Sequence, residues 1–448
     1  MKHYDALVIG GGILGCMAAR NLRRWNISVA LLEQEADVCT GITRANSAIV
    51  YAGYDNKPGS LKAELTVRGN ANMEALAEEL DVPFLRCGSL LVTYDDQTVS
   101  RLVKKLQNGI RNGVPGLQLL SGPEAEAMEP RLKKGVKAAL YAPTTGTVNP
   151  WKLGIAAFEN AVHNGAEVFL NTKVTGIRKL AEGFAVETDK GTYAGKMVFN
   201  CAGLAADKIQ EMVCPPSVRL KLDGAEYLVF DSHVRKPERI IFLQAESCGK
   251  GITAIPCTEG NLLISGVRNP LDIPYGTTAR GLEELQLAVK DLLPETEMGQ
   301  VIRSFGAVRP NPHRETGENV SDFCIENPVP GFYSLIGIKT PGLTASNELT
   351  LHLAQRGAAY LGAEANPTFD PRRKAIHRQE SPEYYEIICQ CGHITRGEIL
   401  EAIRRGATTV DGVKRRVDTG MGRCQGSRCD WRIAKILKES GVNPDPLF

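Results

Sequence analysis

The apolar positions at the start of the chain follow the pattern of a strand, a helix and a second strand. Residues 4–9 (YDALVI) form a short apolar run, residues 13–25 carry apolar side chains at helical spacing, and residues 28–33 (SVALLE) form another apolar run. Short runs of this kind are typical of buried strands. A strand, a helix and a strand within so few residues predict a parallel β-α-β unit.

Beyond this unit, the alternation of apolar and polar positions divides the chain into further segments. Residues 61–80 have leucines on related helical faces, which predicts a helix. Residues 84–144 and 218–320 contain short apolar alternations broken by turn residues, which predict a sheet. Residues 196–209 (KMVFNCAGLAADKI) and 331–354 (GFYSLIGIKTPGLTASNELTLHLA) return to a strand–turn–helix pattern. We therefore expect an α/β fold in which a strand-rich domain is inserted into a nucleotide-binding fold.

The C-terminal part of the chain has a pattern of its own. Residues 363–386 are polar and contain three prolines, which predicts a linker or an extended strap. In the tail, residues 387–448, two amphipathic stretches predict helices, ITRGEILEAIRRG and TTVDGVKRRV. The tail also holds four of the twelve cysteines in two close pairs, so we expect a small separate domain.

The composition narrows the class of protein only slightly. A chain of 448 residues suggests two or three domains, and a net charge of +2 provides no electrostatic case for nucleic acid or an anionic membrane. The uncharged run between Asp5 and Arg20 is too short to span a bilayer, and its glycines explain it better than a signal peptide does. We expect a cytoplasmic protein without a transmembrane segment, in which the eight scattered cysteines are ordinary thiols.

Glycine spacing predicts what the first unit binds. Gly10, Gly12 and Gly15 stand directly between the first strand and the helix. In this arrangement the first glycine permits a tight turn, the second lets a pyrophosphate approach the backbone, and the third lets the helix pack close to the strand. The N-terminus of the helix presents free N–H groups to the phosphates, and Glu33 can accept hydrogen bonds from a ribose. The pattern predicts a dinucleotide but does not distinguish FAD from NAD.

Two later glycine-containing turns favour FAD. The motif NCAGLAAD (residues 200–207) follows a predicted strand, and GIKTPGLT (residues 337–344) precedes a predicted helix. A nicotinamide dinucleotide does not need this additional pair of turns, whereas an extended FAD would use both. With these motifs the chain resembles the FAD-dependent family of D-amino-acid oxidase and glycerol-3-phosphate dehydrogenase, over residues 3 to about 355.

A third motif resembles one branch of that family. NSAIVYAG (residues 46–53), followed by KPGSLKA (residues 57–63), looks like the branch of L-2-hydroxyglutarate dehydrogenases and anaerobic glycerol-3-phosphate dehydrogenases, in which this stretch lies against the flavin. The resemblance implies that the helix N-terminus after Pro341 lies at the pyrimidine edge, where its dipole favours the anionic reduced flavin. Lys339 is either part of this site or a solvated loop lysine. The residues assigned to FAD are Gly10, Gly12, Ile13, Leu14, Gly15, Glu33, Thr43, Arg44, Asn46, Ser47, Val174, Ala202, Gly203, Gly337, Lys339, Pro341, Gly342, Leu343 and Thr344.

The resemblance also implies a substrate-binding arginine. Arg309 matches the arginine with which the family binds a carboxylate or phosphate, and a guanidinium suits this role because it contacts two oxygens at once. The alternative is an arginine in a salt bridge at a strand end.

The sequence departs from the family at other substrate positions. Ala48 and Tyr51 replace the usual Gly and His, and Gly224-Ala225-Glu226-Tyr227 replaces Arg-Gly-Glu-Tyr. The usual base is therefore missing, and Tyr51, with an ordinary pKa of about 10, would be a weak one. His313 is another candidate base, although a lone histidine in a proline-rich loop is more often exposed.

The four clustered cysteines have the spacing of a metal site. Cys389-x-Cys391 is followed, after the two predicted helices, by Cys424-x-x-x-x-Cys429, and two such pairs indicate a four-thiolate site. The tail resembles the bacterioferritin-associated-ferredoxin-like domain, most specifically in TGMGRCQG (residues 419–426), which implies a 2Fe–2S cluster. Four thiolates would also accept zinc, and disulfides are not expected in a chain without an export signal.

Together these observations predict a dehydrogenase with two cofactors. We expect an FAD-dependent oxidoreductase in residues 1–362, a linker in 363–386, and a small helical iron–sulfur domain in 387–448. Within the first part, FAD-binding segments at about 1–80, 145–210 and 321–362 form a Rossmann-like domain, and a mixed β-sheet substrate domain occupies about 81–144 and 211–320.

The expected reaction is the oxidation of a small anionic substrate, glycerol 3-phosphate or a 2-hydroxy acid, with electrons passing through the cluster to a partner subunit or quinone. Association with a membrane would then occur only through a partner. Two alternatives remain open: an amine or imino-acid dehydrogenase of the opine or proline type, and a non-catalytic electron-transfer subunit of a heteromeric complex.

Overall fold

The computed structural model describes residues 1–244, 250–269 and 275–442. Its first part is built around an eight-stranded sheet in the order β10-β11-β12-β1-β2-β9, with β19 beside β12 and β18 beside β19. The strands β1, β2, β9, β12 and β19 run parallel, as a nucleotide-binding fold requires. The strand bounds are β1 Lys2–Ile9, β2 Val29–Leu32, β9 Glu167–Phe169, β10 Val174–Lys179, β11 Phe184–Thr188, β12 Gly191–Asn200, β18 Cys324–Glu326 and β19 Phe332–Ile336.

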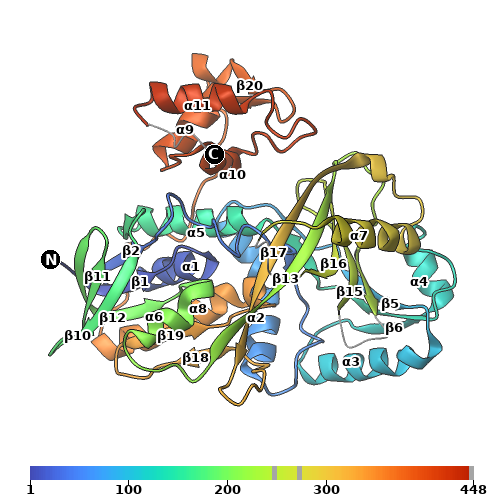
Figure 1. The fold of residues 1–448 in the computed structure, drawn as a ribbon, viewed down its shortest axis with the longest axis horizontal. Coiled ribbons are helices and arrows are strands. Elements are labelled where there is room, and N and C mark those ends of the chain that lie inside the picture. Colours follow the sequence, from blue (N-terminus) through green and yellow to red (C-terminus); the bar gives the residue numbers. More distant parts are fainter. Residues whose placement is uncertain (245–249, 270–274, 443–448) are drawn as a thin grey trace.

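Helices pack on both faces of this sheet (Figure 1). The helix α1 (Ile13–Leu22) contacts α5 (Pro150–His163) and α8 (Gly342–Leu361), and α8 also contacts α2 (Leu61–Glu79); the short α6 (Ala206–Glu211) contacts β10, β12 and β19. Leu22, Leu349 and Leu353 are buried in the core between the helices and the sheet. A Cβ on Gly15 would overlap the carbonyl oxygen of Gly10, so α1 approaches β1 this closely only because that position is glycine.

A second eight-stranded sheet lies beside the first and has the order β17-β13-β16-β15-β14-β5-β7-β6. The long pair β13 and β17 runs antiparallel along the boundary between the two parts, where Figure 1 shows it crossing the middle of the molecule. The bounds are β5 Ser89–Thr93, β6 Gln118–Ser121, β7 Ala138–Ala142, β13 Arg219–Phe230, β14 Ile240–Gln244, β15 Lys250–Pro256, β16 Leu262–Asn269 and β17 Val301–His313. A small sheet of β3 (Ile49–Val50), β8 (Gly146–Val148) and β4 (Phe84–Leu85) joins the two parts.

The sheet predicted for residues 84–144 and 218–320 is present, but these ranges also contain helices that were not predicted. Three helices lie within these ranges: α3 (Val99–Arg111), α4 (Gly122–Met128) and α7 (Ala279–Leu292). The first helix of the chain also ends at Leu22 rather than at residue 25.

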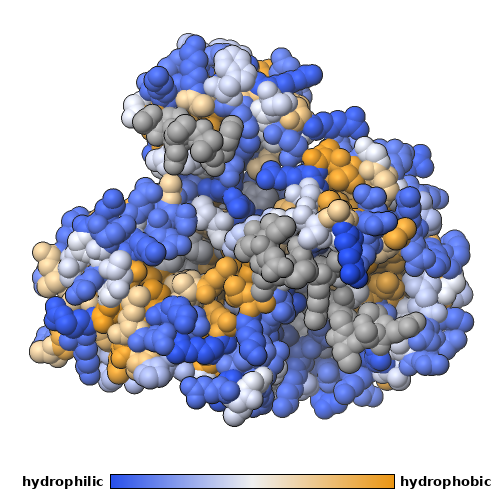
Figure 2. Space-filling model, in the orientation of Figure 1, coloured by the Kyte–Doolittle hydropathy of each residue, from blue (hydrophilic) through white to orange (hydrophobic). Residues whose placement is uncertain are grey.

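The C-terminal part forms a separate small body above α5 (Figure 1). It contains a two-stranded sheet, β20 (Ile387–Cys389) and β21 (Ile394–Thr395), and the helices α9 (Arg396–Arg404), α10 (Val410–Val417) and α11 (Asp430–Glu439) around an apolar core. The preceding segment is extended and hydrogen-bonded to the main body, since Asn160 Nδ2 donates to the carbonyl oxygens of Asp370 and Arg372 at 3.0 Å. In Figure 2 the visible face is mostly hydrophilic, and the C-terminal body stands out as a distinct lobe.

Candidate functional site

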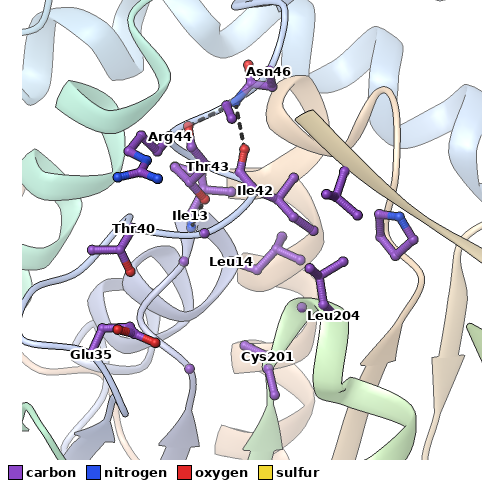
Figure 3. A pocket seen from close by; sticks show the side chains of 18 of the residues that line it. Ile13, Leu14, Glu35, Thr40, Ile42, Thr43, Arg44, Asn46, Cys201 and Leu204 are labelled. Atoms are coloured by element: carbon purple, nitrogen blue, oxygen red, sulfur yellow. Dashed lines mark hydrogen bonds between the residues drawn. The ribbon is translucent and has the colours of Figure 1, made fainter. Parts of the chain in front are cut away.

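A cavity of about 690 Å³ lies at the carboxyl ends of the central parallel strands. This edge of an open α/β sheet is where ligands of such folds bind. Its walls come from the turn after β1, the loop after β2, the turn after β12, and the segment before α8. Figure 3 shows Ile13 and Leu14 at the start of α1 together with Thr43 from the loop after β2 and Cys201 from the turn after β12.

The first turn of α1 is arranged to accept an anion. Gly10 has φ +98°, and a Cβ there would lie 2.6 Å from the carbonyl oxygen of Cys201, so the turn requires glycine. Gly12 is the N-cap, and the N–H of Ile13 donates to Thr43 Oγ1 at 2.9 Å. No acidic residue lies in this first turn, and so its positive dipole end is not neutralised.

Glu33 lies at the end of β2 and lines the same cavity. Its carboxylate is buried and accepts hydrogen bonds from the backbone N–H groups of Gly11 and Glu35. Burial raises the pKa of Glu33 above its ordinary value, while these hydrogen bonds act in the opposite direction.

The loop after β2 is shaped by Asn46. Its Nδ2 donates to the carbonyl oxygens of Thr43 and Ile42 at 2.9 and 3.3 Å (Figure 3), and its Oδ1 accepts from the N–H of Ala48 at 2.8 Å. Ala48 has φ +58°, which the bond from its N–H to Asn46 helps to hold.

The structure brings most of the predicted cofactor residues together, but three of them do not line the cavity. Gly15 packs α1 against β1. Gly337 has a φ of +66° and lies against the ring of Pro312. Thr344 is buried and accepts a hydrogen bond from the N–H of Tyr51 at 3.0 Å. The predicted residues that line the cavity are Gly10, Gly12, Ile13, Leu14, Glu33, Thr43, Arg44, Asn46, Ser47, Val174, Ala202, Gly203, Lys339, Pro341, Gly342 and Leu343.

The cavity ends at Arg309 and Tyr51. A second cavity of about 700 Å³ begins there. Arg309 and Tyr51 line both cavities, and so do Thr340 and Pro341. Arg309 lies on β17 opposite Asp223 of β13, and its buried Nε has no hydrogen-bond partner within the described residues. The guanidinium therefore has an unused donor at the junction of the two cavities.

Tyr51 and Lys339 lie near Arg309, and the pKa of each is shifted from its ordinary value. Burial raises the pKa of Tyr51, against a hydrogen bond with Ser47 and the charge of Arg309, so its phenol is neutral and serves poorly as a base. Burial, and then the charge of Arg309, lower the pKa of Lys339. Lys339 is half-buried, and its Nζ donates to Asn311 Oδ1 at 3.0 Å.

The other substrate-side candidates lie elsewhere. Glu226 is fully buried and accepts hydrogen bonds from the N–H and hydroxyl of Thr278, the N-cap of α7, at 3.1 and 2.8 Å. It is thus a capping partner for a helix. His313 Nδ1 lies 2.9 Å from the carbonyl oxygen of Asn311, and neither Glu226 nor His313 lines either cavity.

Basic side chains from two helices line the second cavity. Lys62 comes from α2, and Arg101, Lys104 and Lys105 come from α3, a helix that the alternation of apolar positions did not predict. Lys105 pairs with Asp55. Together with Arg309, these side chains give the cavity an excess of positive charge.

The four cysteines of the tail meet in two pairs. The sulfurs of Cys391 and Cys424 lie 3.7 Å apart, while Cys389 and Cys429 are both buried. Burial, and then the neighbouring Cys389, raise the pKa of Cys429 to about 12. No three potential ligands within the described part of the chain converge as they would around one ion. Four cysteines in two neighbouring pairs fit the ligand set of a 2Fe–2S cluster.

Several residues of the cavity were not predicted. Tyr227 reaches it from β13 of the second sheet and Tyr275 from the segment before α7, and Thr172 and Asp37 line it near Glu33. The C-terminal body contributes a further set, Thr409, Asp411 and Arg415.

Comparison with known proteins defines the class to which this site belongs. Residues 5–356 match the model of the FAD dependent oxidoreductase family, and residues 387–439 match the BFD-like [2Fe-2S] binding domain. The chain belongs to the FAD-dependent oxidoreductases, and it carries a C-terminal 2Fe–2S domain. The predicted fold class and both predicted cofactors are confirmed.

Particular relatives narrow the resemblance. The chain is 39% identical to a glycerol 3-phosphate dehydrogenase of Caloramator mitchellensis, over 98% of this chain and 95% of the relative. It is 30% identical to the mitochondrial L-2-hydroxyglutarate dehydrogenase of Homo sapiens, over 53% of each chain. Its fold is similar to that of the L-alpha-glycerophosphate oxidase from Mycoplasma pneumoniae, with a TM-score of 0.76 at 23% identity, covering 83% of this chain and 99% of that one. Among the described residues, no helix is long and apolar enough to cross a bilayer.

Proposed function

We propose that this protein is a dehydrogenase that uses FAD to oxidise a small anionic substrate, glycerol 3-phosphate or a 2-hydroxy acid, and delivers electrons through its 2Fe–2S cluster to a partner subunit or quinone. The observation that carries the proposal is the position of Arg309. Arg309 lines both the cavity of the dinucleotide-binding fold and the basic second cavity, and its buried Nε has no hydrogen-bond partner among the residues that the structure describes. A guanidinium in this position can bind the anionic group of a substrate while the rest of the substrate reaches the flavin.

The first cavity supplies the residues that we assign to FAD. The N–H groups at the start of α1 would bind the pyrophosphate, and Glu33 would accept hydrogen bonds from the ribose. Thr43, Arg44 and Ser47 would lie along the cofactor, and the N-terminus of α8 would lie at its pyrimidine edge. We propose that the chain divides into an FAD-dependent oxidoreductase in residues 1–362, a linker in 363–386 and an iron–sulfur domain in 387–448.

The charges of the second cavity favour an anionic substrate over an amino acid. Arg309 and Lys339 would bind its phosphate or carboxylate, and the bases of α3 would attract it from solvent. The neutral phenol of Tyr51 would donate a hydrogen bond to a substrate oxygen. When bound, FAD supplies a two-electron acceptor and the cluster supplies a one-electron carrier.

The exposed Cys391 places one side of the cysteine site at the surface, which supports an external electron acceptor. We propose a partner subunit or carrier in this role. The cysteines among the described residues are free thiols and not disulfides, which supports a location in the reducing cytoplasm.

The test is anaerobic reduction of the purified protein by single substrates. Glycerol 3-phosphate or a 2-hydroxy acid should bleach the visible absorbance of the flavin within seconds, whereas glycerol, which lacks the anion, should not. Iron should be present at two atoms per chain, because the cluster has two irons.

Other outcomes would replace the proposal. Bleaching only by amino or imino acids would identify an amine dehydrogenase. If no small molecule bleached the flavin but a co-purified partner reduced it, the chain would be a non-catalytic electron-transfer subunit.

A further inference from the structure

The C-terminal body forms part of the wall of the FAD cavity. In Figure 1, α10 is the helix of this body that faces the rest of the molecule. Thr409, its N-cap, and Asp411 and Arg415, within it, line the same cavity as Gly12 and Glu33. A domain that serves only as an electron carrier has no need to enclose another cofactor.

A buried ion pair holds α10 in this position. The carboxylate of Asp37, 1% exposed, accepts two hydrogen bonds from the guanidinium of Arg416, at 2.7 and 2.9 Å, and one from Arg415 at 2.8 Å. Thr408 Oγ1 donates to the carbonyl oxygen of Ala36 at 3.2 Å. Because Asp37 lies in the loop after β2 and lines the cavity, the anchor of the C-terminal body is itself part of the cavity wall.

A second anchor lies outside the cavity. Glu159 of α5 is 8% exposed at its side chain and pairs with Arg405 at 3.0 Å and with Arg373 of the extended segment at 2.8 Å. Charges buried this deeply must stay paired, so the docked position is well defined.

The wall contributed by α10 has an unused donor. The side chain of Arg415 is 5% exposed, and its Nε has no hydrogen-bond partner within the described residues. Asp411 lies 3.5 Å from Arg44 and 3.7 Å from Arg415, so it holds two guanidinium groups at this side of the cavity. The guanidinium groups of Arg44 and Arg415, together with the free Nε donor of Arg415, suit a phosphorylated ligand.

This wall borders one particular half of the cofactor. Its contacts are with Ala36, Asp37 and Arg44, beside Glu33 at the end of β2, where a dinucleotide-binding fold places the ribose of the adenosine. Figure 3 shows Glu35, Thr40 and Arg44 together on one side of the cavity. The opposite end of the cavity, where the flavin would meet the substrate, borders the second cavity, and no residue of α10 lines that second cavity.

We propose that Thr409, Asp411 and Arg415 of the iron–sulfur domain bind the adenosine diphosphate half of FAD, so that FAD binding and docking of this domain stabilise each other. A ligand that contacts both bodies binds only the docked arrangement tightly. By reciprocity, FAD increases the docked fraction by the same factor by which docking increases FAD affinity.

The test compares FAD with FMN, which carries the flavin and one phosphate but lacks the adenylate. Protein that has been stripped of flavin and retains its iron is titrated with each flavin, and dissociation constants are measured by fluorescence quenching. Arg415→Ala should weaken FAD binding at least tenfold and leave FMN binding within twofold of the parent. ADP should compete with FAD in the parent and compete at least tenfold less well in the variant. Lys435→Ala, at an exposed position of α11, is the matched control and should change neither constant.

A second measurement needs no variant. Hydrogen exchange of the amides of α10 should slow at least fivefold when FAD is added to the stripped protein, and FMN should not have this effect. Equal losses of FAD and FMN affinity in Arg415→Ala, or unchanged exchange in α10 on addition of FAD, would overturn the proposal. Neither readout depends on substrate turnover, so failure of the proposed reaction would leave this result intact.

Discussion

Arg309 is the side chain on which the proposed substrate chemistry depends most. A charge-assisted hydrogen bond contributes about 1.5–3 kcal/mol, so Arg309→Met should lower kcat/KM for the anionic substrate about 10- to 150-fold. Arg309→Lys keeps the charge but not the planar pair of donors, and its kcat/KM should fall between those of the parent and Arg309→Met. The measurement is steady-state reduction of an artificial acceptor, with flavin content monitored separately.

Arg303 offers a control on the same strand. It is exposed and lines neither cavity, so Arg303→Met should leave kcat/KM unchanged. If Arg309→Met behaved like this control, Arg309 would be a structural residue of β17 and the proposed substrate site would be wrong.

Individual residues differ in how far the sequence could place them. The positions of Gly10, Gly12 and Glu33 follow from local geometry, since a tight turn and a strand end determine them. Tyr227 reaches the cavity from a strand of the inserted sheet, and Tyr275 reaches it from the segment before α7. Which of their side chains faces the cavity depends on register and packing, and no local pattern states that.

At the scale of elements, the close approach of α2 and α8 controls the position of the N-terminus of α8. A Cβ on Gly69 of α2 would overlap the carbonyl oxygen of Thr344 in the first turn of α8. Gly69→Ala should therefore destabilise the protein by about 1–3 kcal/mol, despite the better helix propensity of alanine. It should also weaken FAD binding, because Gly342 and Leu343 line the cavity.

The measurements are the thermal midpoint of unfolding and the FAD dissociation constant. Gly299→Ala is the control, because a Cβ at that position would have no atom within 4 Å and the φ of Gly299 is not in the left-handed region. That substitution should change stability by less than about 0.5 kcal/mol. Equal stability of the two variants would show that α8 moves freely to accommodate the methyl group.

The helices of the second sheet show why elements were harder to predict there. In α3, Val99, Leu102, Leu106 and Ile110 recur at helical spacing, and its basic residues form the wall of the second cavity. The segment is bounded on both sides by strong strand patterns, and these favour an uninterrupted sheet over a helix. By contrast, α1 and β2 were predicted in type and order, though not in their exact ends, because the apolar pattern and the glycine spacing agree in that segment.

At the scale of the whole molecule, docking of the C-terminal body could not be predicted, because its anchors are contacts between distant segments. Asp37 and Arg416 lie in segments that carry no signal of their pairing. The sequence did predict the body, its clustered cysteines and the helices α9 and α10, each of which depends on local spacing, but it did not predict α11. The interface between α10 and the FAD cavity forms only in the folded chain.

The charge of Asp37 makes this docking sensitive to acid. Burial opposes ionisation, but the hydrogen bonds and charges of Arg416 and Arg415 outweigh it and hold the pKa of Asp37 below its ordinary value of 3.8. A carboxylate with a lowered pKa in the folded state stabilises that state above its unfolded pKa, and the stabilisation is lost as the pH falls through the lower folded value. Docking should therefore hold at neutral pH and weaken only below about pH 4.

Asp37→Asn should reproduce the acid state at neutral pH. Removing one partner of a buried ion pair costs about 3–5 kcal/mol, because the guanidinium groups of Arg415 and Arg416 stay buried without their counter-ion. Small-angle scattering at pH 7 should show a larger radius for the variant than for the parent, and the parent should approach that radius only in acid. Glu64→Gln, at an exposed pair with Arg68, should leave the radius unchanged, since such pairs contribute little. A compact Asp37→Asn protein at pH 7 would mean that apolar contacts and Glu159, rather than the carboxylate at the cavity wall, hold the iron–sulfur domain in place.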